Sequence, residues 1–177
     1  MSLVRKQIRT VIKNALLNQT DADARVFTTR VTPVWVTELP VILVYDTEES
    51  VDIWAESPRE YVRKISLSVQ VLMEGEDDLD DDLDVVGQQV ETVLYQDHTL
   101  DEICSDVILV GCNKTLDKDG STLKGSLILN YQVLYHTYAA QDTSDLEWLN
   151  RVDAEYGIFE GAASADDPYD IITGIGD

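Results

Sequence analysis

The sequence has few cysteines and few histidines, and both scarcities limit the chemistry that it can support. Its cysteines, Cys104 and Cys112, are eight positions apart and match no CxxC or metal-ligand spacing. We therefore predict two reduced thiols in a cytoplasmically made protein. The two histidines, His98 and His136, lie in a polar segment and near the end of a predicted strand, outside any recognisable triad signature. We predict that the chain is not an enzyme.

Long hydrophobic runs and glycine-rich phosphate loops are also lacking. No segment approaches the roughly twenty apolar residues that a membrane-spanning helix needs. The start MSLVRKQIRT lacks the apolar run of a signal peptide. Gly111, Gly120 and Gly125 are separated by strand-forming residues and match neither nucleotide fingerprint. We expect no membrane role, no cofactor and no metal.

Basic residues are scarce, because 13 Lys and Arg stand against 34 Asp and Glu, which gives a formal net charge of -21. Such a chain repels phosphate backbones, so tight binding to nucleic acid is not expected. Arg5, Lys6, Arg9 and Lys13 nevertheless cluster in the first predicted helix. They could help protomers or partners meet through opposite potentials. The alternative is the polar outer face of an amphipathic helix.

The densest feature is acidic, with eight carboxylates among the eleven residues from Glu74 to Asp84. These acids precede and enter a predicted helix, where negative charge interacts favourably with the positive end of the helix dipole. A solvated helix start is favoured over a metal or catalytic site, since the run offers no two carboxylates in visibly different environments. The buried stripe of this helix follows steps of three and four residues: Leu79, Leu83, Val86, Val90, Val93 and Leu94.

Asp117, Asp119 and Gly120 resemble part of a calcium-binding loop. The third acidic position and the closing Glu are absent, and a tight Asp-Gly turn between two strands explains the same residues. A calcium-dependent module therefore stays an alternative of a separate class.

The remaining periodicities predict an α+β fold, a mostly antiparallel sheet with two helices packed on one face. A first helix is predicted over Leu3 to Asn18, and the segment bracketed by Pro33 and Pro40 reads as a loop or an edge. We expect the polar TEES sequence to end the second strand, and the last two strands to form a hairpin. The predicted strands are Arg25–Val31, Val41–Asp46, Arg59–Met73, Asp106–Leu116 and Leu123–Tyr138.

From residue 139 onward the composition shifts, and ten acids face one base, Arg151. We predict a domain over residues 1–138 and an acidic C-terminal extension over residues 139–177. Helical spacing of Leu146, Trp148, Leu149, Val152 and Tyr156 suits a docking segment on a neighbouring surface. Folding back onto the chain's own domain explains that spacing equally well.

Tryptophans outside the strongest core patterns are candidate interface anchors. Trp35 and Trp54 lie in or beside proline-bounded and polar segments, and Trp148 lies in the extension. Buried packing is the competing explanation for each of them. The full set of candidate interface residues is Arg5, Arg9, Trp35, Trp54, Asp80, Asp81, Trp148 and Leu149.

Five features occur in a characteristic order between about residues 3 and 138. They are the basic-faced first helix, TPVWVTELPVILVYDTEES, EYVRKISLSVQVLME, the acidic helix start and KGSLILNYQVLYHT. This order resembles the minor tail protein U family, the tail terminator proteins of long-tailed bacteriophages. The acidic extension departs from the shorter members of that family.

The resemblance implies an α+β protomer that assembles as a ring, usually a hexamer, on the head-proximal end of the tail tube. Such a ring stops tube growth and joins the tail to the head by shape, without catalysis. Implied partners are further copies of the chain, the tail tube protein, a neck or head-completion protein and, in a contractile tail, the sheath. DNA would pass through the lumen. The implied location is the tail–neck junction of the virion, after synthesis in the host cytoplasm.

Besides the calcium-dependent module, two alternatives to a tail terminator remain at this point. A neck or head-to-tail joining protein of the same fold would bind only the portal side. An acidic module that mimics DNA would block a basic nucleic-acid enzyme with carboxylates in place of phosphates.

Overall fold

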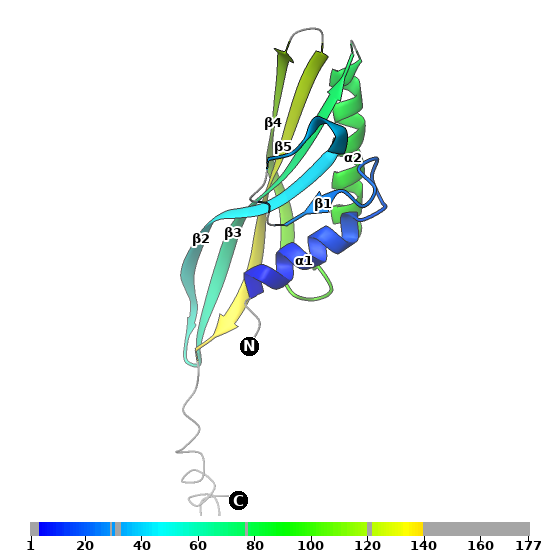
Figure 1. Ribbon diagram of the computed structural model, residues 1–177. Helices are drawn as coiled ribbons and strands as arrows, with labels where there is room; N and C mark the ends of the chain where they lie inside the picture. Colours follow the sequence, from blue (N-terminus) through cyan, green and yellow to red (C-terminus); the bar gives the residue numbers. More distant parts are fainter. Residues whose placement is uncertain (1–3, 29, 31–32, 77, 120–121, 140–177) are drawn as a thin grey trace, which may run out of the picture. The chain divides into compact units, whose positions relative to one another are not determined.

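One face of a five-stranded sheet carries both α-helices of the described chain (Figure 1). The structure is a computed structural model, and it describes residues 4–28, 30, 33–76, 78–119 and 122–139. The strand order is β1-β2-β3-β5-β4, with β1 and β2 parallel and the other neighbours antiparallel. The predicted α+β fold is therefore confirmed. Its elements are α1 (Val4–Leu16), β1 (Val26–Phe27), the 3-10 helix η1 (Val36–Glu38), β2 (Val41–Glu56), β3 (Arg59–Gly75), α2 (Leu79–Gln96), β4 (Asp106–Asp119) and β5 (Thr122–Tyr138).

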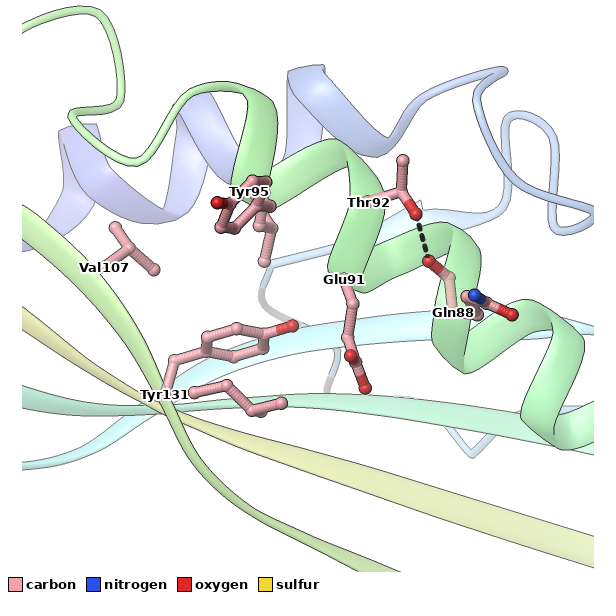
Figure 2. Close-up of a pocket in the computed structure, with 8 residues that line it drawn as sticks. Gln88, Glu91, Thr92, Tyr95, Val107 and Tyr131 are labelled. Carbon is pink, nitrogen blue, oxygen red and sulfur yellow. Dashed lines mark hydrogen bonds between the residues drawn. The ribbon is translucent and has the colours of Figure 1, made fainter.

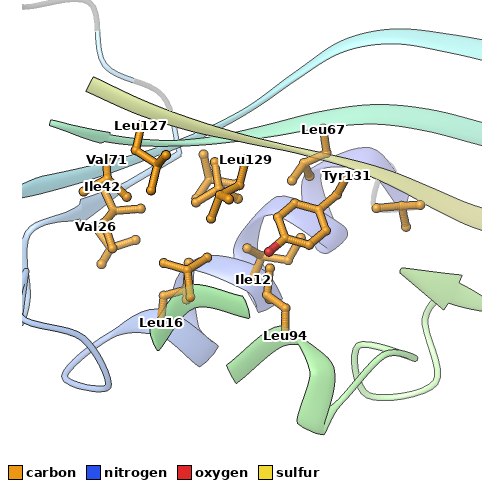
Figure 3. Packing of buried hydrophobic residues seen from close by; sticks show 14 of the residues in the cluster. Ile12, Leu16, Val26, Ile42, Leu67, Val71, Leu94, Leu127, Leu129 and Tyr131 are labelled. Carbon is orange, nitrogen blue, oxygen red and sulfur yellow. The ribbon is translucent and has the colours of Figure 1, made fainter. Parts of the chain in front are cut away.

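The core lies between the helices and the sheet (Figure 3). Helix α1 buries Ile8, Ile12 and Leu16, which recur every four residues and so share one face. The predicted helix over Leu3 to Asn18 is confirmed, although it ends at Leu16. Buried side chains of β3 and β5 alternate along each strand and meet this face: Ile65, Leu67, Val69, Val71, Leu127, Leu129, Tyr131, Val133 and Tyr135.

Helix α2 confirms the stripe predicted from the acidic segment. Leu79, Leu83, Val86, Val90 and Leu94 are buried, and Val93 packs partly against the same core. Gly87 lies where the helix approaches β5 closely, since a Cβ there would meet Leu127 Cδ2 at 2.5 Å. The acids at the helix start therefore precede an element that is held by its apolar face.

Polar side chains hydrogen-bond across the sheet on the face opposite the helices. Ser68 Oγ lies 2.9 Å from Asn130 Oδ1, and Gln70 Nε2 donates to Ser126 Oγ at 2.9 Å. Cross-strand hydrogen bonds of this kind satisfy polar groups that are partly buried within the sheet. One face of the central sheet is thus apolar and covered, and the other is polar and hydrogen-bonded.

The prediction that TEES ends the second strand is wrong. Strand β2 runs on to Glu56 and stays paired with β3 as far as Arg59. The long alternating pattern of β3 provides a hydrogen-bonding partner for this polar continuation, and register shifts follow Asp46 and Ile53. The first predicted strand is correspondingly shorter than expected, because only Val26 and Phe27 pair with β2.

The other predicted connections agree with the structure. The proline-bounded segment is a loop that contains η1, in which the Trp35 backbone N–H donates to Glu38 Oε2 at 2.8 Å. Strands β4 and β5 form the predicted antiparallel hairpin, from Asp106 paired with Leu134 to Asp119 paired with Thr122. Gly120 lies outside the described residues, as do residues 140–177, so the division at residue 138 stays a prediction.

Candidate assembly surfaces

The sheet continues beyond α1 as an arm, which consists of residues 48–64 of β2 and β3 and residues 134–138 of β5 (Figure 1). Apolar side chains in this arm face solvent instead of a core. Val51, Ile53, Trp54 and Tyr138 are all exposed, and Trp54 is 66% exposed. Exposed apolar side chains gathered in one place are typical of interaction surfaces.

The two faces of the arm differ. Ile53 pairs with Tyr61 in β3, on the side of the sheet that carries the helices farther along, and Val51 lies on this same side. Trp54 lies on the opposite side, where its ring packs edge-on against His136 at a centroid distance of 5.3 Å. His136 Nδ1 is 2.7 Å from Glu60 Oε1. On the helix side, the outer part of the arm therefore exposes Val51 and Ile53, and neither α1 nor α2 covers these two side chains.

The base of the arm is fastened to α1 around Glu49, whose side chain is only 11% exposed. Arg5 Nη2 lies 2.9 Å from Glu49 Oε2, and Arg63 Nη1 lies 3.4 Å from the same oxygen. The Tyr135 hydroxyl donates to Glu49 Oε1. Burial raises the pKa of Tyr135, and its hydrogen bond to the carboxylate raises it further. Glu49 thus joins α1, β2, β3 and β5.

Two predicted interface residues have partners within the chain. Arg5 pairs with Glu49, and Arg9 forms an ion pair and a hydrogen bond with Asp46 of β2. Arg5 remains exposed, whereas Arg9 is partly buried. The basic face of α1 therefore binds the helix to the sheet, and this part of its charge is already engaged.

A groove of about 400 Å³ lies between α2 and the edge strand β4 (Figure 2). Tyr95, which is 84% exposed, stands at its rim, and Glu91 is the one charged side chain among those that line it. No described cation lies within ion-pair distance of Glu91. The lining side chains are Gln88, Glu91, Thr92, Leu94, Tyr95, Val107, Leu109 and Tyr131.

The Tyr131 hydroxyl lies in the wall of this groove and is buried without a hydrogen-bond partner among the described residues. Figure 2 shows the Tyr131 ring pointing from β5 towards α2, next to Glu91. Burial raises the pKa of Tyr131, and the charge of Glu91 adds to the effect. A buried hydroxyl without a hydrogen-bond partner is destabilising by about 1–3 kcal/mol. The groove wall therefore contains a polar group whose hydrogen bond is not made among the described residues of the single copy.

Lys114 of β4 fastens the acidic start of α2 to the sheet. Lys114 Nζ of β4 lies 2.6 Å from Asp80 Oδ1 and 2.6 Å from Asp84 Oδ1. These two hydrogen bonds raise the pKa of Lys114. Asp81 is exposed, and no described cation pairs with it. Of the two predicted acids, Asp80 thus holds α2 against β4, and Asp81 faces solvent.

The described tryptophans are exposed, so buried packing does not explain them. Trp35 is 69% exposed in the loop before β2, and Trp54 lies near the far end of the same strand. The structure therefore does not bring these two candidates together. Trp148 and Leu149 lie outside the described residues.

The thiols and histidines agree with the sequence-based expectation. Both cysteines are free. Burial raises the pKa of Cys104 to about 12, with the charges of Asp97 and Asp106 adding to the effect. His98 is exposed in a loop, and His136 lies near the end of β5. Within the described residues there is no group of three or more His, Cys, Asp or Glu that could hold a metal ion, and no helix suited to crossing a membrane.

The arm and the groove were not predicted, although each corresponds to a pattern that is visible in the sequence. Val51 and Ile53 alternate with polar residues, as in a strand with one apolar face. Ile108, Leu109 and Val110 form an uninterrupted apolar run in what proves to be an edge strand. An apolar run in an edge strand indicates a surface that requires a partner. The strand order must be known before β4 can be recognised as an edge strand.

Residues 3–135 match the family described as phage minor tail protein U. The chain belongs to this family. The resemblance seen in the sequence is therefore confirmed, and the minor tail protein U family member is a structural component of a phage tail and thus of a virion.

No curated protein matches this minor tail protein U family member. One matching solved structure is a chain titled "Virion of native gene transfer agent (GTA) particle", at 10% identity and a TM-score of 0.31. That match covers 74% of this chain and 91% of the other.

Proposed function

We propose that this minor tail protein U family member forms a ring on the head-proximal end of the tail tube. The ring ends growth of the tube and offers the surface on which the head or neck joins the tail. The family match over residues 3–135 carries this proposal. The exposed apolar arm supports it, because a protein that acts by shape needs surfaces left uncovered until assembly.

A ring needs a contact between two different surfaces of the same molecule, repeated around a closed rotation. The arm and the groove are two such surfaces on different parts of the sheet. The formal charge of -21 makes the copies repel one another in solution. Assembly then takes place where the tube end holds several copies together, which prevents rings from forming away from the tail.

The same charge suits a passage for DNA. Carboxylates that face a lumen repel the phosphate backbone, so that DNA passes without adhering. We propose copies of the chain, the tail tube protein and a neck or head-completion protein as partners. For the acidic extension, which contains Trp148 and Leu149, we propose docking on a neck protein, an adjacent copy or, in a contractile tail, the sheath.

Electron microscopy of the purified protein mixed with tail tubes tests the proposal. We expect a single ring at one end of each tube and no further growth when tube protein is added. Protein that leaves both tube ends bare but binds a portal–neck complex would instead identify a head-to-tail joining protein. Rings along the whole tube would identify a tube or sheath component.

A further inference from the structure

The arm presents strands whose outer part is covered by neither α1 nor α2, the two α-helices among the described residues. In the central sheet, helix-side residues such as Ile65 and Val133 are buried beneath α1 and α2. In the arm, Val51 and Ile53 occupy the same side of the sheet but remain exposed. The apolar pattern of the covered strands thus continues into a region where no described residue of the helices packs on Val51 or Ile53.

The groove shows the reverse arrangement. One face of α2 borders the groove beside the edge strand β4, and no further described strand lies next to β4 on its outer side. Tyr95 of α2 is 84% exposed, and Leu109 of the edge strand β4 is 39% exposed. The buried hydroxyl of Tyr131 lies in the groove wall without a described partner. The groove has a volume of about 400 Å³.

The free edges of the sheet are compatible with joining these two regions. Strand β4 is the last in the sheet, and β2 has a neighbour on its outer side only at Ile42 and Leu43. The arm portion of β2 and the strand below the groove therefore both have an unpaired edge within the described chain. Unpaired edges with exposed apolar side chains readily accept a strand from another molecule.

We propose that the arm of one copy docks in the groove of the next copy, so that Val51 and Ile53 lie beneath the neighbour's α2 and beside its Leu109. The contact rests on the proposed ring, for which it names the two joining surfaces. It is heterologous, because each copy gives an arm to one neighbour and receives an arm from the other. Repetition around the tube axis closes the ring.

The charges of the two surfaces are complementary. Arg59 lies at the tip of the arm, on the same side of β3 as Tyr61, and is exposed. No described carboxylate lies within ion-pair distance of it. Glu91 is the charged lining residue of the groove and also lacks a described ion-pair partner. In a chain of net charge -21, an exposed base with no ion-pair partner among the described residues is a specific counterpart for an acidic apolar groove.

Cross-linking between two different cysteine variants tests the contact. Full-length protein in a Cys112→Ser background would carry either Val51→Cys in the arm or Thr92→Cys in the groove. In the presence of tail tubes, a short thiol-reactive cross-linker should join the two variants of the mixture into dimers but leave each variant alone as monomers. A chain with both cysteines should give a ladder that ends at the copy number of the ring. Asn14→Cys on α1, an exposed position away from both surfaces, replaces Thr92→Cys as the matched control.

Charge reversal provides the second measurement. Arg59→Glu or Glu91→Arg alone should lower the cross-linking yield about fivefold, the effect of a single exposed ion pair, and the two together should restore it. Loss of yield that the double variant does not recover contradicts the assignment of this pair.

Several outcomes would overturn the contact itself. Dimers of Val51→Cys alone would indicate an arm-to-arm contact, and cross-links from Thr92→Cys to Trp148→Cys would show that the C-terminal extension fills the groove. Absence of dimers in the mixture, while the wild-type protein caps tubes, would refute the contact and leave the proposed function intact. Cross-linking in concentrated solution with bare tube ends would support the contact and refute the proposed function.

Discussion

The helix-covered part of the sheet and the arm are built from the same strands but treat apolar side chains in opposite ways. Ile65 in the covered part is 1% exposed, whereas Ile53 in the arm is 53% exposed. Burial of the Ile65 side chain stabilises the fold of a single copy. The exposed Ile53 side chain contributes little to that stability. The comparison indicates that the covered part of the sheet maintains the fold, whereas the arm leaves apolar side chains exposed in the single copy.

The largest expected difference between the two regions comes from one substitution made in both. Ile65→Ala should lower the free energy of unfolding by about 2–5 kcal/mol, because it leaves a cavity in the packed core. Ile53→Ala should change it by less than about 0.5 kcal/mol, because the side chain is already exposed. Urea unfolding followed by circular dichroism measures both values, and equal losses would remove the distinction between the two parts of the sheet.

A substitution at Glu49, where the arm joins the covered part of the sheet, should lower the free energy of unfolding by a smaller amount. Glu49→Gln removes the charge that pairs with Arg5 and Arg63 and weakens the acceptor of the Tyr135 hydroxyl. We expect a loss of about 1–3 kcal/mol, since hydrogen bonds to a partly buried charged group are lost. Glu48→Gln, at an exposed neighbouring position, is the control and should be close to neutral. A neutral Glu49→Gln would mean that the arm is not held through this residue.

Alkaline pH should destabilise the covered part through its buried acids. Burial raises the pKa of Cys104 from 9.0 to about 12, so the folded thiol keeps its proton after the unfolded thiol has ionised. The folded state then binds more protons, and stability falls as pH rises from about 9 towards 12. Cys104→Ala should show a shallower decline than Cys112→Ala in urea unfolding at a series of pH values. Equal slopes would contradict burial as the cause.

The smallest effect is expected in the groove wall. Tyr131→Phe removes a buried hydroxyl that has no described partner, so stability should be unchanged or rise by up to about 1 kcal/mol. Thermal unfolding of the isolated protein gives this value. Tyr135→Phe is the matched control, and it should destabilise because its hydroxyl donates to Glu49. A clear loss on Tyr131→Phe would show that this hydroxyl has a partner in solution.

The covered part of the fold could be predicted from local spacing. The steps from Leu79 to Leu94 identify α2, and the alternation in β3 identifies its buried face, because each pattern lies within one element. The extension of β2 could not be read in this way. Glu48 and Asp52 resemble loop residues until the partner strand is known, and that pairing is set by contacts distant in sequence.

The candidate surfaces were harder to predict for the same reason. Arg5 and Arg9 form a basic cluster in the sequence, but their partners Glu49 and Asp46 lie far along the chain and come close only after folding. The groove lies between α2 and β4, and no local sequence pattern records how these two elements come together. Sequence analysis thus identified Trp54 in the arm but not the surface to which it belongs.

The most direct measurement is electron microscopy of tail tubes mixed with either wild-type or Ile53→Asp protein. Wild-type protein should place a single ring at one end of each tube. The Ile53→Asp protein, folded by circular dichroism, should leave the tube ends bare, because a charge replaces an apolar contact between copies. Bare ends with the wild-type protein, or equal capping by the variant, would contradict assembly through the uncovered half of the sheet.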